Sequence, residues 1–232
     1  MSNSAGKVDN PGMFSRRSIT TLAVVLAIAL GCITLWAAKE FVAPRPENAS
    51  SYACKDAHPT EKVTAAIELY NSPPKSDIFI TPYVQEGLLP VFLVITNDGD
   101  QPIALTSMRA ELVTSGRAKL ESLNNDDIFR RVAHISGNST NPGRVSPIPL
   151  PNNKNKKTQK QYQEILAANF AAEAVEPHTT KSGFLFFDVF NVKQPVEGSH
   201  IYLTGIRDAN GNELMYFDIP VIPSNATASG VQ

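Results

Sequence analysis

The chain has 232 residues, of which 42% are hydrophobic, and its formal net charge is −1. This composition fits one ordinary domain with a membrane anchor, and it excludes both a disordered chain and a protein with many membrane spans. The near balance of charge gives no support for nucleic-acid binding or for a strongly basic patch that would attract membranes.

An apolar segment near the N-terminus predicts a single transmembrane helix. The run at residues 18–38 contains no charged residue, and at about 1.5 Å per residue it is long enough to cross a hydrocarbon layer of roughly 30 Å. Arg16 and Arg17 before it, and Trp36 near its end, are typical interfacial flanks. We therefore expect residues 1–17 to form a cytoplasmic tail and the C-terminal domain to lie on the periplasmic or extracellular side of the cell membrane.

Three processing patterns stay open as alternatives to a retained signal anchor. Residues 15–19 resemble a twin-arginine export signal, residues 29–32 resemble a lipoprotein cleavage box ending at Cys32, and residues 35–37 resemble a signal-peptidase site. However, the apolar run continues past Cys32 and exceeds the core of about 7–15 residues that is usual in signal peptides. A retained anchor is the expectation.

Prolines, asparagine and serines are frequent in residues 39–60, a composition that predicts a mobile linker. From Val63 apolar and polar residues alternate, which predicts a strand with one buried face over residues 63–70. Residues 78–84 are a second candidate strand. Residues 89–96 are apolar on both faces, so this third strand is expected in the middle of the fold.

A turn is expected at residues 97–100, because Asn, Asp and Gly tolerate positive φ, and it predicts a hairpin. Strand-like segments continue over residues 103–108 and 109–114, with a turn at 115–116. Together these segments predict a meander of short antiparallel strands.

The strand pattern breaks at about residues 124–176, which are expected to form an insert. Residues 126–132 predict a short helix with an acidic start, and the prolines of residues 134–157 predict a loop. Helical spacing returns over residues 158–174. The expected buried face of that helix consists of Tyr162, Ile165, Leu166, Phe170 and Ala174.

Strand patterns return over three further segments, at residues 183–190, 200–207 and 213–221. An Asn-Gly signal at residues 208–212 predicts a hairpin between the last two. About seven or eight strands with turns at this spacing suit an immunoglobulin-like antiparallel β-sandwich over residues 61–222. Residues 223–232 are expected to form a disordered tail.

Two loops hold oxygen ligands close together, as a calcium site would require. They are residues 97–100 and the group Asp208, Asn210, Asn212 and Glu213. Neither completes an EF-hand loop and strands flank the second, so plain β-turns are expected at both. Asp126 and Asp127 are expected to stabilise the exposed N–H groups at the start of a helix.

No chemical motif points to catalysis or to a bound metal or cofactor. Cys54 and His58 have a spacing that would join two metal ligands on a helix, but they lie in the expected linker. Cys54 is the only cysteine after Cys32, so the domain has no intramolecular disulfide. The sequence contains no HExxH, CxxC, GxSxG or phosphate-binding glycine loop. We therefore expect no catalytic residue, no metal and no cofactor, and we expect that the chain is not an enzyme.

Two alternatives stay open beside that expectation. An enzyme could form its cleft where residues 134–176 cover the sandwich, using Asp188, His178 or His200, because loops on rigid scaffolds often carry function. Asp188 and Asp218 lie in apolar strands, where a carboxylate is either buried with a perturbed pKa or turned toward solvent. The other alternative is a carrier of a small ligand or metal.

Three phrases combine strand and turn residues: LPVFLVITNDGD from Leu89, SGFLFFDV from Ser182, and YLTGIRDANGNE from Tyr202. They resemble uncharacterised bacterial envelope proteins that have an immunoglobulin-like β-sandwich. The resemblance covers about residues 60–222 and implies a fold and a compartment, but it carries over no active-site residue. With the anchor at residues 18–38, it predicts a non-enzymatic envelope protein whose domain binds another envelope component or supports an assembly.

Overall fold

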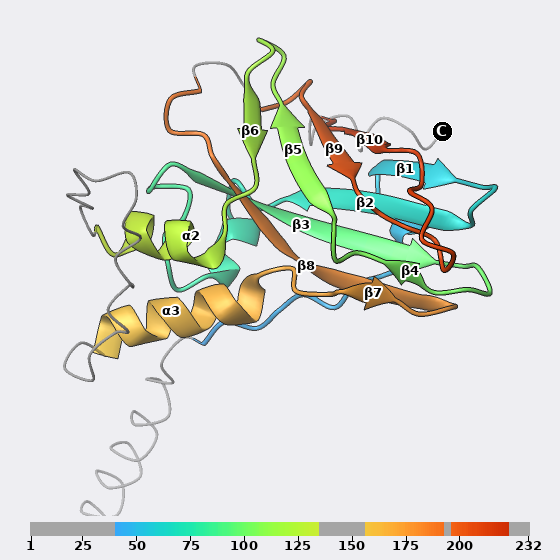
Figure 1. Ribbon diagram of the computed structural model, residues 1–232. Helices are drawn as coiled ribbons and strands as arrows, with labels where there is room; N and C mark the ends of the chain where they lie inside the picture. Colours follow the sequence, from blue (N-terminus) through green and yellow to red (C-terminus); the bar gives the residue numbers. More distant parts are fainter. Residues whose placement is uncertain (1–39, 135–155, 193–195, 223–232) are drawn as a thin grey trace, which may run out of the picture. The chain divides into compact units, whose positions relative to one another are not determined.

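The computed structural model describes residues 40–134, 156–192 and 196–222 (Figure 1). The chain divides into two units, Met1–Lys39 and Glu40–Gln232, and all described residues belong to the second. Its strands are β1 Cys54–His58, β2 Val63–Leu69, β3 Leu88–Asn97, β4 Ile103–Ala104, β5 Arg109–Val113, β6 Lys119–Glu121, β7 Ala174–Val175, β8 Thr179–Asp188, β9 His200–Thr204 and β10 Phe217–Pro220. Its helices are the 3-10 turns η1 Ala49–Ser51 and η2 Lys75–Ile78, and the α-helices α2 Asn125–Val132 and α3 Lys156–Ala168.

Two four-stranded sheets form the body of the domain. Sheet A has the strand order β1-β2-β3-β8, and sheet C has the order β10-β9-β5-β6. Neighbouring strands in both sheets are antiparallel. A small sheet B pairs β4 with β7. The prediction of a mainly β domain built from antiparallel sheets is therefore confirmed.

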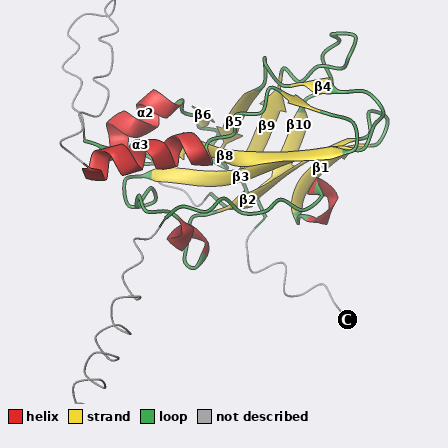
Figure 2. Cartoon of the chain, turned by 90° about the horizontal axis from the view of Figure 1, so that it is seen from below, coloured by secondary structure: helices red, strands yellow, loops and turns green. Residues whose placement is uncertain are grey.

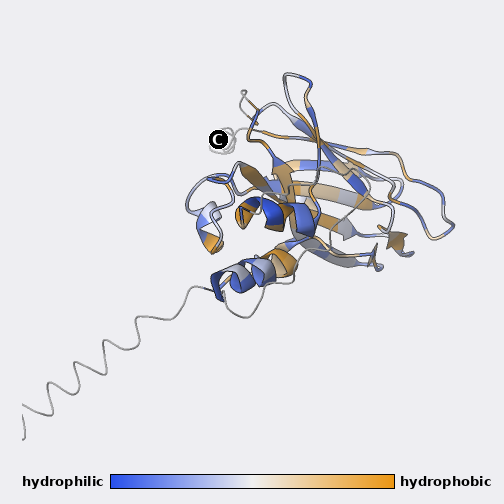
Figure 3. Cartoon of the chain, turned by 60° about the vertical axis from the view of Figure 1, so that its left-hand side comes forward, coloured by the Kyte–Doolittle hydropathy of each residue, from blue (hydrophilic) through white to orange (hydrophobic). Residues whose placement is uncertain are grey.

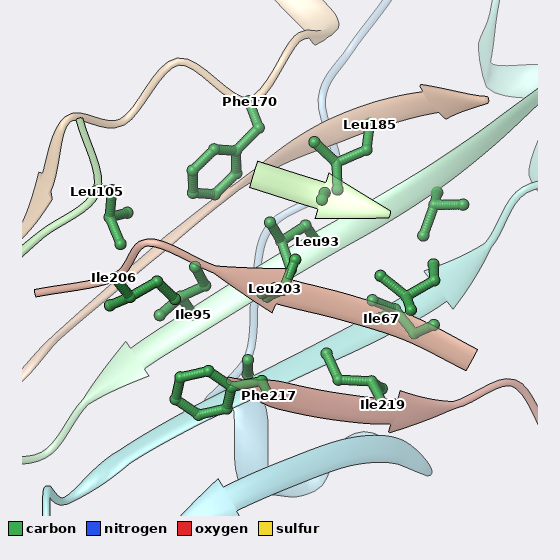
Figure 4. Packing of buried hydrophobic residues seen from close by; sticks show 14 of the residues in the cluster. Ile67, Leu93, Ile95, Leu105, Phe170, Leu185, Leu203, Ile206, Phe217 and Ile219 are labelled. Atoms are coloured by element: carbon green, nitrogen blue, oxygen red, sulfur yellow. The ribbon is translucent and has the colours of Figure 1, made fainter. Parts of the chain in front are cut away.

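Apolar side chains from both sheets meet between them and form the first core (Figure 4). Each fully buried side chain of this kind contributes about 1.5–3 kcal/mol relative to an exposed one. The central members include Ile67, Leu93, Ile95, Leu203, Phe217 and Ile219, all at most 2% exposed.

A second core lies on the opposite face of sheet A. Its strand and loop members are mostly aromatic, namely Tyr70, Phe79, Tyr83, Phe92, Phe184 and Phe186. The two helices, which lie side by side (Figure 2), cover them with Ile128, Phe129, Val132 and Ile165. Much of both helices consists of hydrophilic residues, which are blue in Figure 3. All ten residues of β3 are buried, which confirms that residues 89–96 form a central strand.

Helix α2 starts and ends where its sequence predicts. The Asn124 side chain accepts a hydrogen bond from the Asp127 N–H at 2.9 Å, which satisfies one free donor of the first turn. Asp126 and Asp127 lie in the first turn, and Arg130 and Arg131 in the last, the arrangement that the helix dipole favours. The short helix expected at residues 126–132 is confirmed. Its two aspartates lie in the first turn as expected, but the side chain that caps the helix is that of Asn124.

The linker expected at residues 39–60 is wrong over most of its length. Both η1 and β1 lie within it, Ala49 is fully buried, and β1 pairs with β2 from Cys54 opposite Ile67 to His58 opposite Val63. Backbone pairing with β2 holds β1 at the edge of sheet A. The second core covers the face of β2 expected to meet solvent. For that reason β2 is buried on both faces over its first five residues, not on one face as expected.

Residues 78–84 do not form the expected strand. The Glu164 carboxylate of α3 accepts the backbone N–H groups of Ile80 and Thr81, so these donors are not free to join a sheet. Pro82 follows with no N–H of its own. The segment turns instead and directs Phe79 and other aromatic residues into the second core.

The turn expected at residues 97–100 exists, but it does not make a hairpin. The Asn97 side-chain oxygen accepts the Gly99 N–H at 2.9 Å, and its amide group donates to the carbonyls of Gln101 and Val175. These bonds direct the chain out of sheet A, so that β4 pairs with β7 and not with β3. The strand expected at residues 103–108 is accordingly only two residues long.

The helix expected at residues 158–174 ends at Ala168. Beyond it the Phe170 N–H donates to the Phe184 carbonyl at 2.9 Å, so the chain pairs with the edge of β8. Ala174 belongs to β7, and Leu166, expected on the buried face, is 43% exposed.

The transmembrane helix expected at residues 18–38 lies outside the described residues, as do Cys32, most of the loop at 134–157 and the tail at 223–232. Among the helices that the structure describes, none has both the length and the apolar character needed to span a membrane.

Two glycines with positive φ provide a matched test of the turns around β9. Gly205 has φ +75°, and a Cβ there would lie 2.1 Å from the Ser107 carbonyl oxygen, whereas Gly211 has φ +85° and open space around it. We expect Gly211→Ala to lower the unfolding free energy by about 1 kcal/mol, and Gly205→Ala by about 3 kcal/mol or more, since overpacking adds to the strain. Urea unfolding of both variants measures this difference, and equal losses would contradict the described contact.

Buried tyrosines predict a loss of stability at alkaline pH. Burial, followed by the nearby Glu164 carboxylate, raises the pKa of Tyr83, and burial likewise raises the pKa of Tyr70. Above about pH 10 the unfolded chain loses protons that the folded chain keeps, so the unfolding free energy falls by about 1.4 kcal/mol per pH unit for each such tyrosine. Urea unfolding between about pH 8 and pH 11 measures this slope.

Tyr83→Phe provides the control for that slope. The Tyr83 hydroxyl is buried and has no hydrogen-bond partner among the described residues. We therefore expect Tyr83→Phe to leave the unfolding free energy at neutral pH unchanged or slightly higher, and to reduce the alkaline slope. An unchanged slope would show that Tyr83 does not contribute to it.

Candidate functional site

The three residues of the enzyme alternative are dispersed in the structure. His178 precedes β8 and Asp188 ends it, which separates them by about 30 Å at the usual rise of a strand. His200 lies on β9 in the other sheet. His178 pairs with Asp100, with 3.3 Å between Nε2 and Oδ1, and Asp188 pairs with Arg131. The fold therefore does not bring these side chains together.

Cys54 and His58 are likewise apart, at opposite ends of β1 and about 13 Å from each other. The Cys54 sulfur accepts the Ile222 N–H at 3.3 Å, and the His58 ring stacks on Phe217 with 4.0 Å between centroids. Within the described ranges, no three His, Cys, Asp or Glu residues are grouped so as to hold a metal ion.

The loop at residues 208–212 is a turn held by its own aspartate, as expected. The Asp208 carboxylate accepts the backbone N–H groups of Asn210 and Asn212, each at 2.8 Å, and the Asn212 side-chain amide at 3.0 Å. These hydrogen bonds, that of the Asn212 side chain first, lower the pKa of Asp208. The carboxylate is thus engaged within the turn.

The outer face of sheet C is a more promising site. Inward and outward residues alternate along its strands, and the outward ones are partly or fully exposed. Register places them in two rows across the sheet, and Figure 1 shows the strands of that sheet. One row is Asp218, Tyr202, Glu111 and Glu121, and the next is Pro220, His200, Val113 and Lys119. We call this surface the outer face of sheet C.

Three aromatic rings lie in contact on this face and form what we call the ring cluster: His200, Tyr202 and Tyr216. The His200 and Tyr202 rings stack at 6.2 Å between centroids with an interplanar angle of 20°, and the Tyr202 and Tyr216 rings lie 5.8 Å apart at 52°. Tyr216 is 53% exposed. The cluster therefore offers aromatic surface to solvent from a rigid sheet.

A hydrogen bond and an ion pair hold the polar groups around the central ring. The His200 Nδ1 donates to Oδ1 of Asp218 at 2.6 Å on one side of Tyr202, and Lys119 Nζ lies 3.0 Å from Oε1 of Glu111 on the other. Partial burial, and then the Asp218 carboxylate, raise the pKa of Tyr202. Tyr202 therefore keeps its hydroxyl proton at neutral pH.

Asp56 fixes the strand that carries Asp218. Its Oδ2 accepts the Asp218 backbone N–H at 2.8 Å and lies 3.5 Å from the His58 Nε2. Because Asp56 lies on β1 of sheet A, this bond joins the edges of the two sheets. Asp56 is therefore a positioning residue for the ring cluster.

Sequence reasoning named His200 and Asp218 but did not connect them. It did not identify Tyr202, Tyr216 or Asp56 as functional candidates. The alternation of HIYLTGIR and ELMYFDIPV does place each set of outward residues on one face. The hairpin expected at residues 208–212 does join β9 to β10. What the sequence lacked was the register of that pair and the pairing of β9 with β5.

The chain matches no protein-family model and none of the curated proteins. Three solved structures are similar to it in part. A presumed lipoprotein from Bacillus subtilis aligns with a TM-score of 0.35 and 11% identity, over 77% of this chain and 42% of that chain. A structural genomics target aligns with a TM-score of 0.28 and 12% identity, over 70% of this chain and 89% of its own. A conserved hypothetical protein from Bacillus anthracis aligns with a TM-score of 0.27 and 10% identity, over 70% and 97%.

This chain thus spans less than half the length of the Bacillus subtilis protein. At these TM-scores, the likeness supports no inference about function.

Replacing Asp56 tests its role as an anchor of β10. We expect Asp56→Ala to lower the unfolding free energy by about 1–2 kcal/mol, because it leaves the partly buried Asp218 N–H without its acceptor. Asp56→Asn keeps an acceptor oxygen and should lose less than half as much. Urea unfolding compares the two variants, and equal losses would mean that the hydrogen bond is not what Asp56 contributes.

Proposed function

We propose that the chain is a non-enzymatic protein of the bacterial cell envelope whose β-sandwich domain binds another envelope component through the outer face of sheet C. The supporting observation is the difference between the two sheets. The central strand of sheet A, β3, is buried over its whole length, whereas the outward side chains of sheet C are at least partly exposed throughout the described domain. Side chains held on strands are positioned more precisely than those on loops, which suits recognition.

The proposal includes an anchor at residues 18–38, with the domain on the periplasmic or extracellular side and an immunoglobulin-like arrangement of its strands. The uncharged apolar run and its flanking arginines support the anchor.

Site-specific photo-crosslinking in membranes tests which face binds. A benzophenone amino acid replaces Tyr216 on the outer face of sheet C, and in a matched control it replaces the exposed Asp77 in η2, which lies outside that sheet. We expect discrete crosslinked species from position 216 and none of the same mass from position 77. Identical patterns at both positions, or none from position 216, would contradict the proposed binding face.

A further inference from the structure

We propose that the outer face of sheet C binds an uncharged oligosaccharide chain across the ring cluster. This inference rests on the proposed function and names the class of partner. Aromatic rings and paired polar side chains occur together on this face, and sugars present C–H groups on one side of the ring and hydroxyl groups at its rim. The two surfaces are therefore chemically complementary.

The ring cluster can pack against sugar rings. His200, Tyr202 and Tyr216 follow one another at 6.2 and 5.8 Å between centroids, and the faces of such rings attract C–H groups. The two outer rings of the cluster, those of His200 and Tyr216, therefore lie at most about 12 Å apart. That span suits a short chain of linked sugars better than a single sugar.

Charge on this face is nearly balanced. The carboxylates of Asp218, Glu111 and Glu121 lie beside the cations Lys119 and Arg109 on the same outward side of the sheet. Neither a polyanion nor a polycation would gain much electrostatic energy on such a surface. An uncharged ligand is favoured for that reason.

The paired polar side chains around Tyr202 favour a hydroxyl-rich ligand over a protein. An apolar protein interface would remove water from the pairs His200–Asp218 and Glu111–Lys119, which costs free energy unless every polar atom is satisfied again. Charged residues are accordingly depleted at the centres of protein interfaces. Sugar hydroxyls donate and accept hydrogen bonds, so they can replace the water around both pairs.

Calorimetric titration of the full-length chain tests the proposal, with the protein kept in a detergent that has no sugar headgroup. The probes are three uncharged hexasaccharides: cellohexaose, hexa-N-acetylchitohexaose and maltohexaose. We expect at least one to bind, and we expect Tyr202→Ala and Tyr216→Ala each to weaken that binding about tenfold, since each removes a stacking surface. Tyr202→Phe and Tyr216→Phe keep the rings and should stay within about threefold of the original affinity.

Phe190→Ala is the matched control, because Phe190 is an exposed aromatic ring, 67% accessible, that packs against Arg131 away from this face. It should leave the affinity unchanged, and circular dichroism of all five variants confirms that they are folded. The proposal is overturned if no hexasaccharide binds, or if the two alanine variants on the outer face bind as well as the original chain. If sugars do not bind while position 216 still crosslinks to a protein, the oligosaccharide inference fails and the proposed binding face stands. If both experiments fail, both proposals fail.

Discussion

Burial of β3, the central strand of sheet A, on both faces is the constraint on which the rest of the domain depends. β3 has no exposed residue, so its two faces need two separate cores. Sheet C supplies the cover for one face, and α2, α3 and the turn around Phe79 supply the other. The helices are therefore as necessary to the domain as the second sheet, because without them a row of aromatic side chains would face water. Their sequences lie in the stretch that interrupts the strand pattern, yet the two helices are an integral layer of the fold.

Sheet C needs cover on one face only, because only its inner face contributes to a core. Its outward positions are free to carry groups that a second core would exclude, such as the His200–Asp218 pair beside Tyr202. Both sheets thus contribute to the first core, but only sheet C keeps one whole face available for surface chemistry. They remain connected at the corner where Asp56 of sheet A holds the backbone of Asp218 in sheet C. A change in β1 would therefore be felt in the position of the ring cluster.

The sequence predicted those elements whose pattern is local. The two-sided apolar run of β3, the acidic start of α2 and the Asn-Gly turn before β10 were each recognised from neighbouring residues. Errors arose where a distant group decides the local structure. The Glu164 carboxylate takes the N–H groups of Ile80 and Thr81, and the Asn97 side chain directs the chain toward Val175. The same limit applies to the site. The turn at residues 208–212 indicates that β9 and β10 are neighbours, but no local pattern shows that β5 pairs with the other side of β9 or in which register.

The bonds that Asp56 and Cys54 make have a consequence for how this domain can associate with others. On the side of β10 away from β9, the Asp218 N–H donates to Asp56, Pro220 has no N–H to offer, and the Ile222 N–H donates to the Cys54 sulfur. An incoming strand would find no donor available at these successive positions. Sheet C therefore cannot be extended into a continuous intermolecular sheet along this edge. Strand exchange and fibre-like growth are blocked there by ordinary side chains, and copies crowded together on a surface could touch along this edge without fusing their sheets.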